Sequence, residues 1–231
     1  MLQAKNLTKN YGENTALNNL NLTIPEGEIF ALLGQNGAGK TTTINCFLGF
    51  VDPSSGEAII NGLSVKDNPQ ETKKYVAYIP ESVMLFPNLT GIENLKYFSF
   101  LSGHQYADDE LEMLLKRAGL QTTAFNERMS GYSKGMRQKV GIAIALAKKA
   151  KALLLDEPSS GLDPKAANEF TETIGELAKN GTAILMATHD IFRAKEVARR
   201  VGIMREGNLV SVIDAATISA NELEKLYLQT V

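Results

Sequence analysis

A glycine-rich loop between two structured segments constrains this chain most. Residues 34–41 read GQNGAGKT, which fits the pattern G-x-x-x-x-G-K-[ST]. The apolar run 29–33 before the loop predicts a buried strand, and residues 42–48 after it predict a helix. Only glycine enters positive-φ conformations at low energetic cost, so such a loop can wrap closely around a polyphosphate. The strand–loop–helix order therefore predicts a nucleotide site.

The loop residues have separate expected roles. Successive backbone N–H groups and the N-terminus of the following helix would face the anion. Lys40 is expected to reach the β- and γ-phosphates, and the Thr41 hydroxyl to ligate Mg²⁺. The alternative, a glycine-rich turn that happens to precede a helix, fits the context less well. The nucleotide-binding residues predicted in the loop are Gly34, Asn36, Gly37, Ala38, Gly39, Lys40, Thr41 and Thr42.

Two adjacent carboxylates follow a second apolar run, at residues 152–155. Neighbouring residues at a strand end point to opposite sides, so Asp156 and Glu157 are expected to have different roles. Asp156 suits the Mg²⁺ shell, and Glu157 suits a base that polarises the attacking water. Acidic residues that merely cap a strand at a turn would explain the segment equally well if it stood alone. After a phosphate loop, the catalytic interpretation is favoured.

Two further segments come after the carboxylate pair. Residues 160–163, SGLD, precede Pro164, which suits the first turn of a helix; Asp163 could serve as its N-cap. A β-branched, apolar strand is then predicted over 182–188 and ends at His189. A lone histidine at a strand end is more often structural. After the next strand of a phosphate-loop fold, His189 is instead expected to sense the γ-phosphate.

A further segment, YSKGM at 132–136, opens a predicted helix about twenty residues before the carboxylate pair. Ser133 could be a simple N-cap. A serine and a glycine at a helix N-terminus also make an anion clamp, which would involve Ser133 and Gly135. The basic cluster at 148–151 needs no ligand, because cations at a helix C-terminus complement the macrodipole.

Together these motifs resemble the ATP-binding subunit of ATP-binding-cassette (ABC) transporters over nearly the whole chain. The phosphate loop, the carboxylate pair, the 160–163 loop and His189 match that family in order and spacing. Tyr11 stands where the family places an aromatic residue that stacks on adenine. The resemblance implies an α/β fold: a phosphate-loop NTPase core of mostly parallel sheet, an N-terminal antiparallel β layer and an inserted helical subdomain.

The resemblance also implies boundaries within one ATP-binding-cassette domain, residues 1–231. Residues 1–85 and 131–231 would form the ATPase core with its β layer. Residues 86–130 would form the helical subdomain, and the helical spacing of its apolar residues near 111–118 agrees with this. Apolar residues at 84–89 lie where the family couples the site to the transporter, although a core role for some is an equal alternative.

ATP and Mg²⁺ are the cofactors that the resemblance implies. Glu157, His189 and Lys40 would be catalytic, while Thr41, Asp156 and Glu81 would approach the metal. Tyr11 would bind the base, and Ser133, Gly135 and Asp163 would complete the nucleotide site. In the family, Ser133 and Gly135 correspond to residues that contact the γ-phosphate bound by the opposite subunit. The expected partners are thus a second cassette copy, in a homodimer or heterodimer, and a separate transmembrane permease.

Two segments depart from the family pattern. The usual signature is LSGGQ, and the signature segment here, residues 132–136, has unusual types at Lys134 and Met136. The segment YIPE at 78–81 ends in Glu81, where the family normally has glutamine. A carboxylate can still approach Mg²⁺ directly or through water. Both variants resemble a branch of exporter subunits that handle drugs, peptides, lipids or ions.

Composition limits the possible partners. The 24 Lys and Arg residues nearly balance the 26 Asp and Glu residues, so no nucleic-acid partner is expected. A cluster of basic residues at 193–200 is expected on a helix, as a solvated face. The one cysteine, Cys46, excludes a disulfide scaffold and is expected to pack in the core.

The expected location follows from the lack of long apolar runs. None approaches the roughly 18 residues of a membrane helix, and the first residues lack the apolar segment of a signal peptide. We therefore expect a cytoplasmic protein, peripheral on the inner face of the cell membrane through the permease. Two alternatives are a cassette ATPase that acts on a soluble assembly partner and an ordinary phosphate-loop kinase or GTPase. The guanine motif N-K-x-D of a GTPase is not found.

Overall fold

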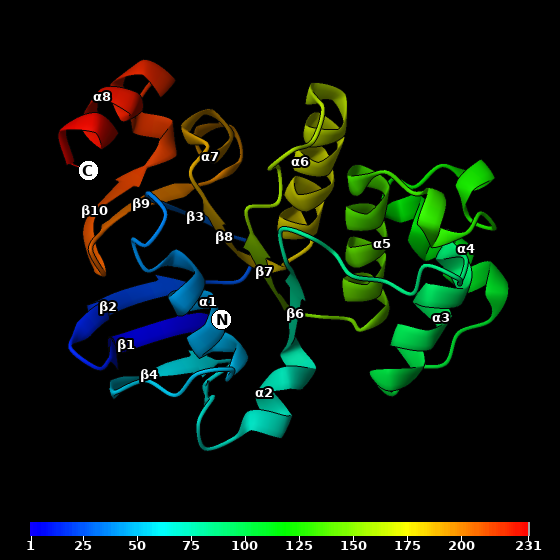
Figure 1. The fold of residues 1–231 in the computed structure, drawn as a ribbon, viewed down its shortest axis with the longest axis horizontal. Helices are drawn as coiled ribbons and strands as arrows, with labels where there is room; N and C mark the ends of the chain where they lie inside the picture. Colours follow the sequence, from blue (N-terminus) through cyan, green and yellow to red (C-terminus); the bar gives the residue numbers. More distant parts are fainter. Residues whose placement is uncertain (231) are drawn as a thin grey trace.

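Two β-sheets and the helices around them make up the computed structural model, which describes residues 1–230 (Figure 1). The first sheet is antiparallel, with the strand order β2-β1-β4-β5. Its strands are β1 (Leu2–Tyr11), β2 (Asn14–Ile24), β4 (Ser55–Ile60) and β5 (Leu63–Ser64). Asn61 and Gly62 join β4 to β5 with φ of 52° and 78°, the left-handed pair that a tight hairpin turn requires.

The second sheet is mostly parallel, with the order β10-β9-β3-β8-β7-β6. Only β10 runs antiparallel to its neighbour, β9. Every residue of β3, β7 and β8 is buried, which explains why the sequence shows continuous apolar runs there rather than alternation. The strands are β3 (Ile29–Leu33), β6 (Val76–Ile79), β7 (Ala152–Asp156), β8 (Ala183–Thr188), β9 (Arg200–Arg205) and β10 (Asn208–Asp214).

Helices cover both faces of the second sheet. Helix α1 packs between the two sheets, while α5 and α6 lie on the opposite face, with α3 and α4 against α5 (Figure 1). The helices are α1 (Lys40–Leu48), α2 (Pro69–Tyr75), α3 (Gly91–Leu101), α4 (Asp108–Arg117), α5 (Lys134–Ala147), α6 (Pro164–Lys179), α7 (Ile191–Val197) and α8 (Ala220–Thr230); short 3₁₀ turns cover Thr122–Ala124, Met129–Gly131 and Ala215–Thr217.

Strand β3 contributes side chains to two separate cores. Phe30 and Leu32 face the first sheet and α1, whereas Ala31 and Leu33 face α5, α6 and the helices beyond them. This alternation follows from the two-residue period of a strand. The predicted α/β fold, with its mostly parallel sheet and antiparallel β layer, is confirmed.

The basic cluster at 193–200 does not lie on one helix, so that prediction was wrong. Helix α7 ends at Val197, and Arg200 begins β9. Glu28 is buried and needs a charged partner, which the Arg200 guanidinium supplies with Nη2–Oε1 at 2.6 Å. The Arg200 cation thus lies at the start of strand β9, inside the sheet, rather than on a solvated helical face.

None of the helices within residues 1–230 has the combination of length and apolar character needed to cross a bilayer.

Candidate nucleotide site

The parallel strands bring the predicted motifs to one edge of the second sheet. In the register of β3, β8 and β7, Leu33 lies opposite Thr188, and Ala187 lies opposite Asp156. The loop after β3, the carboxylates at the end of β7 and the histidine after β8 therefore meet at the carboxyl ends of their strands. This is the edge at which open α/β sheets bind ligands.

Glycine is required at two positions of the phosphate loop. Gly37 and Gly39 have φ of 85° and 106°, values that side-chain-bearing residues rarely adopt. A Cβ on Gly39 would also lie 2.6 Å from the carbonyl oxygen of Ala16 on β2. Gly39 is the N-cap of α1, so the tight packing holds the start of that helix and its free N–H groups against the first sheet.

Lys40 curls back over the loop that precedes it. Its ammonium donates to the carbonyl oxygens of Gly34 at 2.6 Å and Gln35 at 3.2 Å. The same Nζ lies 3.6 Å from Oε1 of Glu157, and both side chains are largely buried. The cation is thereby held inside the loop, where it faces the space that a polyphosphate would enter.

Thr41 and Asp156 form a pair of oxygen donors beside the loop. The Thr41 hydroxyl donates to Oδ2 of Asp156 at 3.1 Å. Burial raises the pKa of the Asp156 carboxyl, and the negative charges of Glu157 and Glu81 add to this, while the Thr41 hydrogen bond and Lys40 oppose it. A cation placed beside Asp156 would stabilise the negative charge that burial disfavours.

Glu157 has different hydrogen-bond partners from Asp156. Its φ is 45°, an unusual left-handed conformation for a residue other than glycine. Oε2 accepts from the Thr188 hydroxyl at 3.2 Å and lies 2.9 Å from Nδ1 of His189. Oε1 is buried without a hydrogen-bond partner, although the Lys40 ammonium is close. The two carboxylates thus have separate surroundings, as the sequence predicts.

A cavity of about 340 Å³ joins these groups. It brings together the predicted phosphate, metal and base residues from three separate segments of the chain. Glu81, in the loop after β6, lies at its wall. The lining residues are Gln35, Asn36, Gly37, Gly39, Lys40, Thr41, Thr42, Glu81, Asp156 and Glu157.

Other predicted site residues lie outside this cavity. Tyr11 ends β1 with 47% of its surface exposed, and the Lys9 ammonium lies 4.9 Å from its ring centre. Ser133 and Asp163 line a separate cavity of about 220 Å³ between α5 and α6. His189 is largely exposed beside Glu157.

Ser133 and Asp163 both act as helix caps in this structure. The Ser133 hydroxyl accepts from the Met136 N–H at 3.2 Å at the start of α5. Asp163 accepts from the Ala166 N–H at 3.0 Å at the start of α6. Gly135 lies where the two helices approach closely, because a Cβ there would be 3.2 Å from that of Ala166. Capping accounts for both polar side chains, and their nucleotide roles stay predictions.

The sequence reasoning missed Gln138 as a part of the site's support. This buried side chain on α5 donates through Nε2 to the carbonyl oxygen of Pro158, directly after the carboxylate pair. Its Oε1 is buried without a hydrogen-bond partner. One signal was available, since Gln138 stands four residues before Ile142 and so shares a helix face with an apolar residue. Gln138 ties the signature helix to the loop that carries Glu157.

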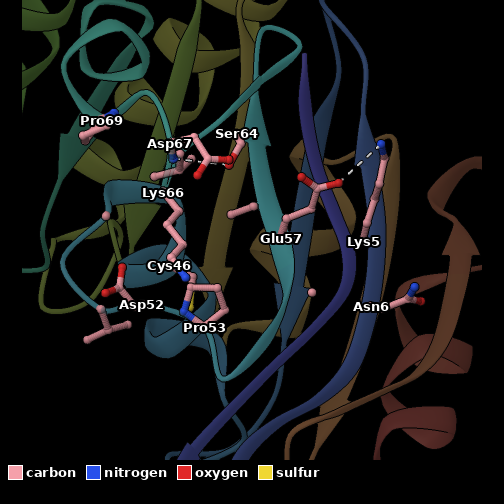
Figure 2. A pocket seen from close by; sticks show the side chains of 15 residues that line it. Lys5, Asn6, Cys46, Asp52, Pro53, Glu57, Ser64, Lys66, Asp67 and Pro69 are labelled. Carbon is pink, nitrogen blue, oxygen red and sulfur yellow. Dashed lines mark hydrogen bonds and ion pairs between the residues drawn. The ribbon is translucent and has the colours of Figure 1, made fainter.

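A larger cavity, of about 650 Å³, lies away from these motifs and is lined by none of the predicted site residues (Figure 2). Its wall runs from β1 and β4 to the segment before α2. Lys5 pairs with Glu57 there, with Nζ–Oε1 at 3.7 Å. Burial raises the pKa of the Cys46 thiol on this wall to about 11, so the predicted packing role suits the residue.

The residues that line the 340 Å³ cavity suit Mg²⁺ bound together with phosphates. Within residues 1–230, no group of three or more His, Cys, Asp or Glu side chains could hold a metal ion by itself. Mg²⁺ is usually held by one or two carboxylates, waters and substrate phosphates, so such a group is not needed. The adjacent oxygens of Thr41 and Asp156 fit that kind of site.

The phosphate loop, the sheet edge and the carboxylates define a phosphate-loop NTPase. The family model described as "ABC transporter" matches residues 17–160. The chain therefore belongs to the ABC transporter family, as an ATP-binding subunit with ATPase activity. The predicted family and the predicted enzyme class are thus confirmed.

Two relatives and one solved structure illustrate the match. The bacitracin transport ATP-binding protein BcrA of Enterococcus faecalis is 36% identical over 94% of this chain and 70% of its own. The lantibiotic transport ATP-binding protein SrtF of Streptococcus pyogenes is 33% identical over 98% of this chain and 96% of its own. The solved structure is a dimeric ATP-binding cassette in a post-hydrolysis state, bound to ADP and Pi. It superposes with a TM-score of 0.82 at 28% sequence identity, and the match covers 93% of this chain and 99% of that one.

Proposed function

We propose that this chain powers an exporter, as one of two cassettes that close on ATP and separate after hydrolysis. One observation carries the proposal: the phosphate loop and the signature segment of a single chain line different cavities. Lys40 lies in one, and Ser133 lies in the other. A signature that binds γ-phosphate must therefore meet the phosphate loop of a second copy, and the dimeric solved cassette supports this arrangement.

Within each site, the chain's residues have distinct roles in binding. The loop N–H groups and Lys40 hold the phosphates, and Tyr11 stacks on the base. Thr41 and Asp156 would hold Mg²⁺, with Glu81 nearby, and the bound ion would supply neutralisation of phosphate charge. Ser133 and Gly135 of the second copy, with Asp163 nearby, complete the shell around the γ-phosphate.

Hydrolysis needs a base and a group that stabilises the transferred phosphoryl. Glu157 accepts the proton of a water that attacks the γ-phosphorus, and the bond from that phosphorus to the oxygen of ADP breaks. The contact at 2.9 Å between Oε2 and Nδ1 of His189 orients both side chains. His189 then turns to the γ-phosphate as charge develops there. Loss of the γ-phosphate removes the group that joins the copies, so they separate.

The membrane partner would be a separate permease that docks near Glu81. Met84 is 86% exposed three residues later, and the Phe86 ring packs edge-on against Tyr97 with centroids 5.0 Å apart. These apolar groups lie between the nucleotide site and α3, within the proposed helical subdomain and its boundary. Docking there would hold the chain at the inner face of the membrane.

Export rather than import is inferred from the relatives named for bacitracin transport and lantibiotic transport. Deleting the gene should lower the inhibitory concentration of such compounds for the host cell. Wild-type protein should restore resistance, and Glu157→Gln should not. Unchanged resistance together with reduced uptake of a nutrient would indicate an importer instead.

The shared site is tested by mixing two inactive variants. Lys40→Ala removes phosphate binding in its own loop, and Ser133→Arg blocks the γ-phosphate of the opposite copy. In a heterodimer both defects fall on one site and leave the other intact, so partial ATPase activity should return. Distinct tags confirm that heterodimers are present. The matched control mixes Lys40→Ala with a chain carrying both substitutions, which leaves no intact site; rescue there, or none in the first mixture, would contradict the shared site.

A further inference from the structure

Two of the three residues that depart from the family pattern, Lys134 and Glu81, contact one another in this chain. The Lys134 ammonium lies 3.7 Å from Oε1 of Glu81. The same Oε1 accepts from the Ser160 hydroxyl at 2.9 Å. The three residues come from separate segments: the loop after β6, the first turn of α5 and the loop after β7. Nothing in the sequence order places them together.

Each of these charges is unfavourable where it stands alone. Lys134 is the first residue of α5, where the helix macrodipole disfavours a cation. Glu81 lines the cavity that also holds Asp156 and Glu157, next to the loop expected to bind a polyanion. Lys40 is the only lysine among the residues that line that cavity. A third carboxylate at its wall would repel phosphate unless a cation offsets it.

We propose that Lys134 masks the charge of Glu81, so that the two departures form one compensating pair that preserves ATP affinity. Lys134 is then a positioning residue: it acts on nucleotide binding through Glu81, within the same chain. Ser160 fixes which oxygen of Glu81 meets the lysine. The inference rests on the proposed assignment of the 340 Å³ cavity as the ATP site.

The effect should be modest, because both side chains are partly exposed, by 32% for Lys134 and 54% for Glu81. Pairs of this kind shift equilibria by roughly two- to five-fold. Screening by salt should reduce the shift, since the pair is open to solvent. The sign is fixed by the geometry: loss of Lys134 weakens ATP binding only while residue 81 is a carboxylate.

A double-mutant cycle on the full chain tests this, with ATP affinity measured by calorimetry in EDTA and low salt. Without Mg²⁺ no hydrolysis occurs, so binding is read directly. Lys134→Gln should weaken ATP binding about two- to five-fold. In a Glu81→Gln background, Lys134→Gln should change the affinity little. Lys134→Arg, which keeps the cation, should retain wild-type affinity, and melting temperatures report whether every variant is folded.

Lys74→Gln is the matched control, because Lys74 also pairs with a glutamate, Glu71 at 2.7 Å, but lines neither the 340 Å³ nor the 220 Å³ cavity. It removes the same charge from the chain but not from Glu81, so ATP affinity should stay unchanged. If Lys134→Gln changes ATP affinity equally in both backgrounds, or in neither, the compensating pair is wrong, while the proposed ATP site still stands. Failure of the wild-type chain to bind ATP would overturn the proposed site as well.

Discussion

At the scale of single residues, Glu157 is the side chain on which most contacts of the site converge. Thr188, His189 and Lys40 all approach its carboxylate, and its backbone adopts a left-handed conformation. An uncommon backbone conformation persists only where the surrounding structure holds it. That cost is consistent with a carboxylate aimed at a reacting water rather than at the surface.

Glu157→Gln should leave ATP binding intact and lower turnover by roughly 10²–10⁴, the usual contribution of a positioned base. The amide keeps the shape and an acceptor for Thr188 but cannot take a proton. Hydrolysis at saturating Mg-ATP and ATP affinity are measured together. Glu196→Gln is the control, because that glutamate pairs only with Arg193 on the surface of α7. Near-normal hydrolysis by Glu157→Gln would assign the base to another residue.

Cys46 gives a prediction about pH. Burial raises the pKa of its thiol from 9.0 to about 11, so the native state keeps the proton where the unfolded chain loses it. At pH 9, a pKa of about 11 rather than 9.0 leaves a thiolate population roughly 50-fold smaller than in the unfolded chain. Alkylation of native protein at pH 9 should be slower by at least about that factor than in urea. The stability that the protonated thiol contributes should fall as pH rises from 9 towards 11. Equal labelling rates in native and unfolded protein would contradict the burial of this residue.

At the scale of elements, the start of α5 depends on a residue that precedes the helix. Tyr132 is buried, and its hydroxyl donates to the carbonyl oxygen of Ala124 at 2.5 Å. Burial raises the pKa of this phenol to about 12, so it remains a donor at neutral pH. Gly91, the first residue of α3, leaves room for the hydroxyl, which a Cβ there would meet at 2.3 Å. The signature segment is thereby fixed to the helices that surround it.

Tyr132→Phe should therefore destabilise the chain by about 1 kcal/mol, because the bond from a buried hydroxyl to the Ala124 carbonyl oxygen is lost, while the Glu127 N–H still donates to that oxygen. For a chain of this size that lowers the melting temperature by roughly 2–4 °C. Tyr97→Phe removes a hydroxyl from a half-exposed ring and should leave the melting temperature unchanged. If both substitutions have the same small effect, the Tyr132 hydroxyl does not anchor the segment.

How far the sequence predicts an element depends on whether its cause is local. The strands and the phosphate loop could be predicted because their signals are local. The apolar runs that form most of β3, β7 and β8 and the glycines of the loop each occupy only a few consecutive residues. The pairing of Glu81 with Lys134 and the bond from Gln138 to Pro158 join distant segments, and only the fold reveals them. The helix carrying the 193–200 basic cluster was predicted to extend too far, because Arg200 forms an ion pair with Glu28, 172 residues earlier in the chain.

At the scale of the whole molecule, the exposed apolar side chains near Glu81 predict where the permease docks. Met84→Glu should leave the melting temperature and the ATPase activity of the isolated chain unchanged. A buried charge in the interface would weaken docking, so co-purification with the permease should fall at least about ten-fold. Val210→Glu, at another exposed apolar position, on β10, is the control and should keep the permease. Normal co-purification of Met84→Glu would place the interface elsewhere.

Strand β3 faces two cores, and this has a consequence for which changes in chain length the protein tolerates. Inserting one residue into β3 would exchange the faces of every side chain after it, so Leu32 would enter the space of Leu33 and Ala31 that of Leu32. The same insertion would displace the phosphate loop relative to Asp156 and Glu157. Residues 65–68, between β5 and α2, carry no such double constraint. Insertions and deletions should therefore accumulate in that connection, while the spacing from Ile29 to Lys40 stays fixed at every viable length of the chain.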